Sequence, residues 1–162
     1  MRIARAWVYG DDINTDLIIA GKYTKTLDFK ELADHCMEDL DPDFRLKVNQ
    51  GDILVAGQNF GCGSSREQAP LALKYAGISA VLASSFARLF YRNAINVGLP
   101  VIICDTSSIK DGDKIEIDED NGLVTINNDK FINCQKFPPI MQSILSYGGL
   151  VSFLKENGDF IF

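Results

Sequence analysis

Short apolar runs alternate with segments of helical periodicity through the first two thirds of the chain. The runs at residues 51–57, 78–84 and 99–104 predict short buried strands. An earlier run, residues 3–10, predicts another strand that is closed by Gly10 and the polar turn at 11–16. The intervening periodic segments predict helices over residues 28–40, 66–77 and 85–98. This alternation of strand and helix favours parallel crossovers and an α/β layer.

The first predicted helix has a clear start signal. Asp28 is a good N-cap, and Glu31 three residues later is placed as the return partner of a capping box. Leu32, Cys36 and Leu40 then fall on one helical face.

The last third of the chain has a different character. Two alternating segments flank Asn121-Gly122, a pair typical of a type I′ hairpin turn. A short helix from about Pro139, a break at Gly148-Gly149 and a second helix follow. We therefore expect one α/β domain over residues 1–162 with an added β-hairpin layer.

Charge and composition narrow the range of functions. The chain has 162 residues and a formal net charge of −6, which argues against nucleic acid as a partner. We see no signal peptide and no apolar stretch of the roughly 20 residues needed to cross a bilayer, so cytoplasm is the expected location. The sequence has four cysteines without a C-x-x-C pair, which argues against a disulfide framework or a self-contained metal site: Cys36, Cys62, Cys104 and Cys134. His35 is expected at the surface or near a helix end, not as a ligand.

The stretch "NFGCGSSREQAP", residues 59–70, joins a buried strand to a helix start. Ligands collect at the carboxyl ends of strands in α/β sheets, and helix N-termini attract anions. Gly61 and Gly63 permit a close backbone approach, and Arg66 offers a fork that suits a carboxylate. The residues thus predict an anion site with the Ser64 and Ser65 hydroxyls in it. A plainer interpretation stays open, in which a serine caps the helix and the arginine is a surface charge.

Three more specific functional motifs do not match this stretch. A P-loop needs a lysine after the last glycine, and a nucleophile elbow needs G-x-S-x-G; neither is present. A Ser-His-Asp triad has only His35 to draw on.

Three motifs in the same order carry a resemblance to a known family. "DDINTDLIIAGKY", "NFGCGSSREQAP" and "SFARLFYRNAINVGLP" resemble the small subunits of 3-isopropylmalate dehydratases, which are similar to the swivelling C-terminal domain of aconitase. The resemblance runs from about Val8 to Ile103. It implies a single β/β/α three-layer domain.

The resemblance also implies roles for individual residues. Ser64 matches the family's catalytic base, which removes a proton next to a carboxylate while hydroxide leaves from the neighbouring carbon. Ser65 and Arg66 match positions that hold the substrate carboxylate. Asp16 matches an aspartate that supports the acid–base network.

The family's cofactor is a [4Fe–4S] cluster held by three cysteines, and this chain offers no such set. The resemblance therefore implies half an enzyme, with no cofactor of its own. A larger partner subunit would carry the cluster and close over the turn, and the substrate would be a small di- or tricarboxylate. We expect the isolated chain to be inactive.

Substrate choice falls on the loop "GKYTKTLD", where Tyr23, Thr24, Lys25 and Thr26 stand at the positions that differ between family members. The pattern is similar to the one associated with isopropylmalate, with Lys25 in place of arginine and Thr24 in place of an apolar residue. Homoaconitate, dimethylmalate and methylmalate/citraconate stay open as alternatives. Gln68 differs from the family pattern, because many relatives have histidine at this position. We expect this difference to change a hydrogen bond behind Arg66.

Cys62 beside the predicted base is expected to be a small packing residue. Arg88 and Arg92, four residues apart, share one helical face and form either a positive rim towards substrate or partner or ordinary surface charge. A second class of function also stays open: a binding module that keeps the anion turn without catalysis. The combination of Asp16, Ser64, Ser65 and Arg66 favours the hydro-lyase subunit.

Overall fold

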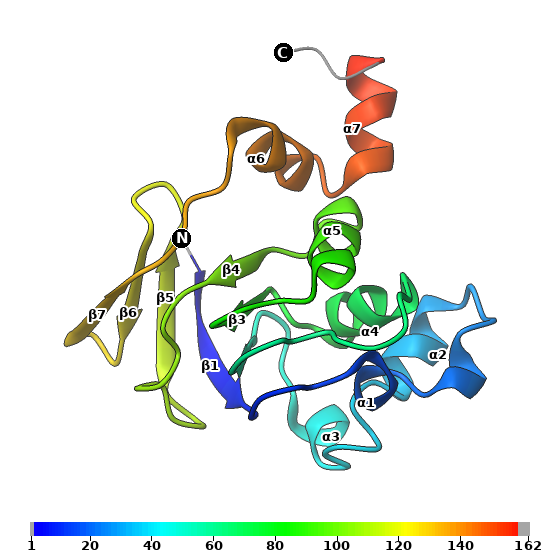
Figure 1. Ribbon diagram of the computed structural model, residues 1–162, viewed down its shortest axis with the longest axis horizontal. Helices are drawn as coiled ribbons and strands as arrows, with labels where there is room; N and C mark the ends of the chain where they lie inside the picture. Colours follow the sequence, from blue (N-terminus) through cyan, green and yellow to red (C-terminus); the bar gives the residue numbers. More distant parts are fainter. Residues whose placement is uncertain (1, 159–162) are drawn as a thin grey trace.

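A computed structural model describes residues 2–158, and its strands form one seven-stranded sheet in the order β4-β3-β2-β1-β5-β6-β7 (Figure 1). The strands are β1 (Arg2–Val8), β2 (Ile53–Ala56), β3 (Ala80–Ala83), β4 (Val101–Ile103), β5 (Lys114–Asp118), β6 (Leu123–Ile126) and β7 (Lys130–Asn133). The helices are α1 (Thr15–Ile18), α2 (Phe29–Asp34), α3 (Phe44–Lys47), α4 (Gln68–Ala76), α5 (Arg88–Asn96), α6 (Pro139–Ser146) and α7 (Leu150–Asn157), with a 3₁₀ turn η1 at Gly21–Tyr23.

The first four strands are parallel, as the alternation of strands and helices predicts. Every residue of β2 and β3 is buried, because layers cover both faces of the sheet there. α4 joins β2 to β3 and α5 joins β3 to β4, so both are the expected crossover helices. The turn after β2 is thereby placed at the carboxyl edge of the parallel strands.

The antiparallel strands form a second β-layer through β1, which changes partner along its length. Its residues Arg2–Arg5 pair with β5, whereas Ala6–Val8 pair with β2. In β5 and β6 only alternate residues are buried, so one face of this layer packs on the core and the other faces solvent. Figure 1 shows β5–β7 on one side of the parallel strands and α1, α2 and α4 on the other. The expected α/β class and β/β/α layering are confirmed.

The turn prediction for the hairpin is wrong in detail. Gly122 has a φ of 64°, but Asn121 is not among the residues with positive φ, so the pair is not a type I′ turn. Asp118 accounts for the difference, because its carboxylate accepts hydrogen bonds from the backbone and side-chain nitrogens of Asn121. The left-handed pair occurs instead at Asn127 and Asn128, with φ of 52° and 64°, and leads into β7, a strand that the sequence analysis missed.

The first predicted helix is shorter than expected. Asp28 caps it as predicted, accepting from the N–H groups of Lys30 and Glu31. The return bond of the capping box is replaced, because the Asp28 N–H donates to the Thr26 hydroxyl at 3.0 Å. α2 ends at Asp34, and turns follow as far as residue 40.

The two C-terminal helices lie beside α5 (Figure 1) and are separated at Gly148-Gly149 as predicted. The Lys74 ammonium of α4 donates to the carbonyl oxygens of Val97 at 2.8 Å and Gly148 at 3.4 Å, which ties this region to the crossover helices. No helix in residues 2–158 has the length and apolar character that crossing a membrane requires.

Candidate active site

The turn that follows β2 is shaped by two glycines, of which Gly61 packs against α5 and Gly63 lies beside Asn14 and Thr15. Gly61 and Gly63 have φ of 82° and 88°, in the left-handed region that glycine adopts without strain. A Cβ added at Gly61 would lie 2.2 Å from Cγ of Phe90 on α5. The turn can therefore approach α5 this closely only because residue 61 has no side chain.

The same turn pairs with the segment after β1. The Gly61 N–H donates to the Ile13 carbonyl at 2.8 Å, and the Thr15 N–H donates to the Cys62 carbonyl at 2.9 Å. The buried hydroxyl of Thr15 adds a third bond, to the carbonyl oxygen of Ser64 at 2.8 Å. These bonds fix the backbone of the turn against the start of α1.

The paired segments bring the predicted residues together. Arg66 donates to the Asp16 carboxylate in an ion pair whose side chains are 22% and 62% exposed. Ser64 and Ser65 are both exposed, and the Asn93 side-chain amide of α5 donates to Oγ of Ser65 at 3.2 Å. The site thus presents two hydroxyls and a guanidinium at an open surface.

The interpretation of a serine as helix cap is wrong. α4 begins at Gln68 with Glu67 in the N-cap position, so both serines lie in the loop before the helix. The carbonyl oxygen of Ser64, which would open a helix at this point, already accepts from Thr15. The serine hydroxyls are consequently not used by the backbone of α4.

The predicted substrate loop lies beside Arg66. A Cβ added at Gly21 would be 3.6 Å from both terminal guanidinium nitrogens of Arg66. The Tyr23 ring stacks on His35 with centroids 3.9 Å apart, and His35 Nδ1 lies 2.8 Å from a Glu38 carboxylate oxygen. That hydrogen bond lowers the pKa of the Glu38 carboxyl.

The rest of the loop is held mainly through backbone atoms. The Gln68 side-chain amide donates to the Thr24 carbonyl at 2.8 Å, and the Thr24 hydroxyl donates to the Gly21 carbonyl at 2.7 Å. Lys25 is exposed, and the Thr26 hydroxyl accepts a hydrogen bond from the Asp28 N–H at the start of α2. Of the four predicted loop residues, Tyr23 and Thr24 are thus tied to the scaffold.

Sequence reasoning missed Thr15 and Asn93, which fix Ser64 and Ser65 respectively. Neither residue has a local signal in the sequence, because the Thr15 bond joins residues 49 positions apart and the Asn93 bond joins residues 28 positions apart. Gln68 was noticed, but its amide reaches the Thr24 carbonyl in the loop.

The thiols of this chain do not fit an iron–sulfur cluster. Cys36 follows α2, Cys62 lies in the turn, and Cys104 and Cys134 form a β-bridge elsewhere. Burial raises the pKa of the Cys36 thiol, and raises that of Cys104 to about 12, whereas metal ligation requires thiolates. In the described part of the chain, no three His, Cys, Asp or Glu side chains form a metal-binding group.

The fold and the turn match a defined class of domain. Residues 10–105 match the family model described as the aconitase C-terminal domain. The chain is 58% identical over 160 residues to the 3-isopropylmalate dehydratase small subunit 2 of Archaeoglobus fulgidus, covering 97% of this chain and 96% of that protein. It is 56% identical to the methanogen homoaconitase small subunit of Methanocaldococcus jannaschii, covering 94% and 91%.

A crystal structure described as 3-isopropylmalate dehydratase from Methanocaldococcus jannaschii superposes with a TM-score of 0.93, at 55% identity over 96% of this chain and 94% of that one. A 2,3-dimethylmalate dehydratase small subunit of Eubacterium barkeri is 51% identical, covering 92% of this chain and 93% of that protein. The chain belongs to the aconitase C-terminal domain family, within its branch of dehydratase small subunits.

The close approach at residue 61 predicts a large cost for a side chain there. Gly61→Ala would combine overpacking against Phe90 with a left-handed backbone, and we expect the free energy of unfolding to fall by about 2–4 kcal/mol. Gly112→Ala is the matched control, since its φ is 88° with open space around the added Cβ, and it should cost only about 1 kcal/mol. Urea unfolding of both variants checks this; equal losses would contradict the role of the Phe90 contact.

The Gln68 bond predicts how firmly the substrate loop is held. Gln68→Glu replaces the amide donor with a carboxylate, so the hydrogen bond to the Thr24 carbonyl is lost. Losing about 1 kcal/mol of stabilisation raises the fraction of molecules in which this loop is locally unfolded about fivefold. Limited trypsin digestion should then cleave after Lys25 about five times faster. Gln50→Glu makes the same change at an exposed position and should leave the rate unchanged. An unchanged rate in Gln68→Glu would show that other contacts hold the loop.

Proposed function

We propose that this chain is the small subunit of a hydro-lyase that interconverts 2-isopropylmalate and 3-isopropylmalate by dehydration and rehydration. The observation that carries the proposal is the turn in which Ser64 and Ser65 are exposed and the neighbouring Arg66 is paired with Asp16. The fold is that of relatives named as dehydratase small subunits.

Ser64 is the proposed base. Its carbonyl is fixed by Thr15 while its hydroxyl stays exposed, so the backbone is rigid and the side chain is open to a ligand. As an alkoxide, Ser64 takes the proton from the carbon next to a carboxylate, and the hydroxyl group on the neighbouring carbon leaves with its bonding electrons. This step gives the unsaturated acid and hydroxide, with the proton held on the serine oxygen. Transfer of that proton to the hydroxide then gives water and restores the alkoxide. A serine has this basicity only where positive groups stabilise the alkoxide, and the Arg66 guanidinium is close in sequence and exposed enough to contribute.

Ser65 and Arg66 are proposed to bind the substrate carboxylate. Because Asn93 donates to Oγ of Ser65, the Ser65 hydroxyl hydrogen is left to donate to an anion. Arg66 donates to Asp16 through one terminal nitrogen, and a guanidinium fork has further N–H groups for a second carboxylate. Asp16 thereby orients the arginine.

The exposure of both serines indicates that this chain needs a partner. A base at an open surface is solvated by water, and oxyanion stabilisation is strong only where water is excluded. We propose that a larger subunit closes over the turn and carries the [4Fe–4S] cluster, which supplies the Lewis acid for the leaving hydroxide.

Sequence identity does not separate the candidate substrates, because relatives named for isopropylmalate, homoaconitate and dimethylmalate chemistry are 58%, 56% and 51% identical. We propose that the loop beside Arg66 distinguishes between these substrates. In this loop Lys25 is exposed, Tyr23 stacks on His35, and Thr24 is bonded by Gln68. Isopropylmalate is our assignment from the loop pattern. Homoaconitate is the second candidate, favoured by the relative at 56% identity.

Reconstitution tests the reaction and the substrate together. The chain is mixed anaerobically with a cluster-loaded large subunit, and formation of the unsaturated acid is followed by absorbance with isopropylmalate, homocitrate, dimethylmalate and citramalate in separate assays. We expect turnover of isopropylmalate, lost about a thousandfold or more in Ser64→Ala and retained in Ser152→Ala, an exposed serine of α7. Turnover of another acid would reassign the substrate, and a formed complex with no turnover would favour the non-catalytic binding module.

The Asn93 bond predicts a specific kinetic signature. Asn93→Asp places an acceptor beside Ser65, so the serine hydrogen turns to the new carboxylate and the substrate anion meets an added negative charge. KM should rise about tenfold or more with kcat changed less than about threefold. Asn93→Ala should raise KM less, and Asn133→Asp at an exposed position of β7 should leave both constants unchanged. Equal falls in kcat and kcat/KM would instead place Asn93 in the chemical step.

A further inference from the structure

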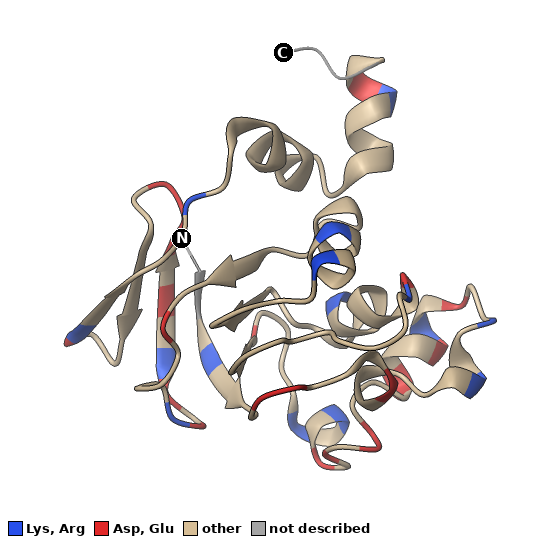
Figure 2. Cartoon of the chain, viewed as in Figure 1, with Lys and Arg blue, Asp and Glu red and all other residues tan. Residues whose placement is uncertain are grey.

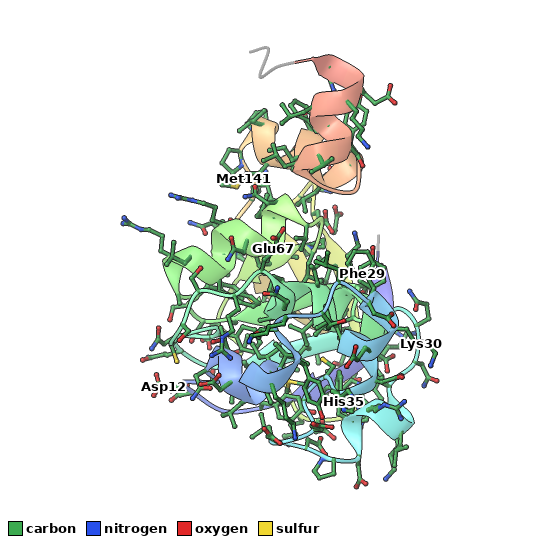
Figure 3. The ribbon with its side chains drawn as sticks, turned by 90° about the vertical axis from the view of Figure 1, so that its right-hand side faces the viewer. Asp12, Phe29, Lys30, His35, Glu67 and Met141 are labelled. Carbon is green, nitrogen blue, oxygen red and sulfur yellow. The ribbon has the colours of Figure 1, made fainter. Side chains whose placement is uncertain are left out.

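A groove of about 540 Å³ lies between α5 and α6, outside the catalytic turn. Its apolar floor and wall are Tyr91, Ile95, Ile140, Met141 and Ile144, with Met141 projecting from α6 (Figure 3). Arg88, Arg92 and Asn96 of α5 complete the lining. An apolar groove with a charged rim is typical of a binding surface.

Both rim arginines lack an ionic partner in the described part of the chain. The arginines Arg5, Arg45 and Arg66 are each paired with an aspartate, whereas Arg88 and Arg92 are exposed and unpaired. α6, on the facing side, carries no charged residue (Figure 2). In a chain with a net charge of −6, two adjacent unpaired guanidinium groups form a local positive site that suits a carboxylate.

One helix, α5, contributes residues both to the groove and to the packing of the catalytic turn. Asn93, which donates to Ser65, directly follows Arg92 on α5, and Leu89 of the same helix is 49% exposed. Phe90 on this helix lies against Gly61 of the turn. A chain that covers the serines therefore meets α5, the helix that also lines the groove.

We propose that this groove, which we call the α5–α6 groove, docks an apolar segment of the larger subunit that carries a carboxylate for Arg88 and Arg92. The inference rests on the proposed function, since that function requires a second chain over the turn. The apolar floor contributes burial on docking, and the two arginines select and orient the segment. The α5–α6 groove would thus set how the larger subunit is placed over Ser64.

The test measures binding separately from catalysis. Affinity of the purified chain for the large subunit is measured by biolayer interferometry at low and at physiological salt. The double variant Arg88→Glu/Arg92→Glu should bind at least about thirtyfold more weakly, with a smaller dependence on salt. Met141→Asp should weaken binding through the apolar floor. Thermal unfolding of each variant verifies that the fold is intact.

Two controls isolate the α5–α6 groove. Lys114→Glu/Lys130→Glu makes the same change of charge on exposed residues of β5 and β7, away from α5 (Figure 2), and should bind like the wild type. Ser64→Ala should lose turnover and keep its affinity.

The outcomes are distinct. Wild-type binding with an unchanged affinity in the arginine variant overturns the docking inference and leaves the proposed function standing. Absence of any complex with the wild-type chain overturns the proposed function itself, and the inference with it. Unchanged subunit affinity combined with loss of dicarboxylate binding in the arginine variant would make the α5–α6 groove a small-molecule site instead.

Discussion

The site depends on parallel backbone pairing that continues beyond the ends of the strands. β1 and β2 are paired over three residues each, and the bonds from Gly61 to Ile13 and from Thr15 to Cys62 extend this pairing into the two loops that follow. Backbone hydrogen bonds fix direction and register together. The start of α1 and the loop before α4 are therefore presented side by side. Without this extension, the ion pair of Asp16 and Arg66 would have to organise two flexible loops by itself, and an exposed ion pair contributes little.

This arrangement explains how the exposed turn is held in one position. The turn is bounded by a buried hydroxyl on one side and by an aromatic ring on the other, through Thr15 and Phe90. Both contacts are to groups whose own positions are fixed by the core. The serine hydroxyls are consequently attached to a fixed backbone, although they face solvent. Under the proposed function, such a surface is one half of a preorganised site, and the larger subunit supplies the other half.

The sequence was sufficient to predict those secondary-structure elements whose signals are local. Apolar runs and glycine boundaries predicted the parallel strands, and Asp28 marked the start of α2. The errors arose where a distant or competing partner decides the conformation. The Ser64 carbonyl is taken by Thr15, which no local pattern reveals, and the side chain of Asp118 prevents the expected turn at Asn121. Asp16, Ser64 and Ser65 were singled out through the resemblance of their motifs to a known family, and the structure places their segments side by side. Asn93 was not singled out, because its bond depends on how α5 packs beside the turn.

The loop beside Arg66 is anchored in part by contacts that do not depend on which side chains it carries. The Gln68 amide binds the Thr24 carbonyl oxygen, and the backbone N–H groups of Tyr23 and Thr24 donate to the carbonyl oxygens of Ala20 and Gly21. A backbone held in this manner tolerates replacement of its outward residues, since the anchoring atoms are the same in every amino acid. Under the proposed function, substrate preference can then change by a few substitutions in this loop while Ser64, Ser65 and Arg66 keep their places. The specificity of each related enzyme would thereby be adjusted independently of its chemistry.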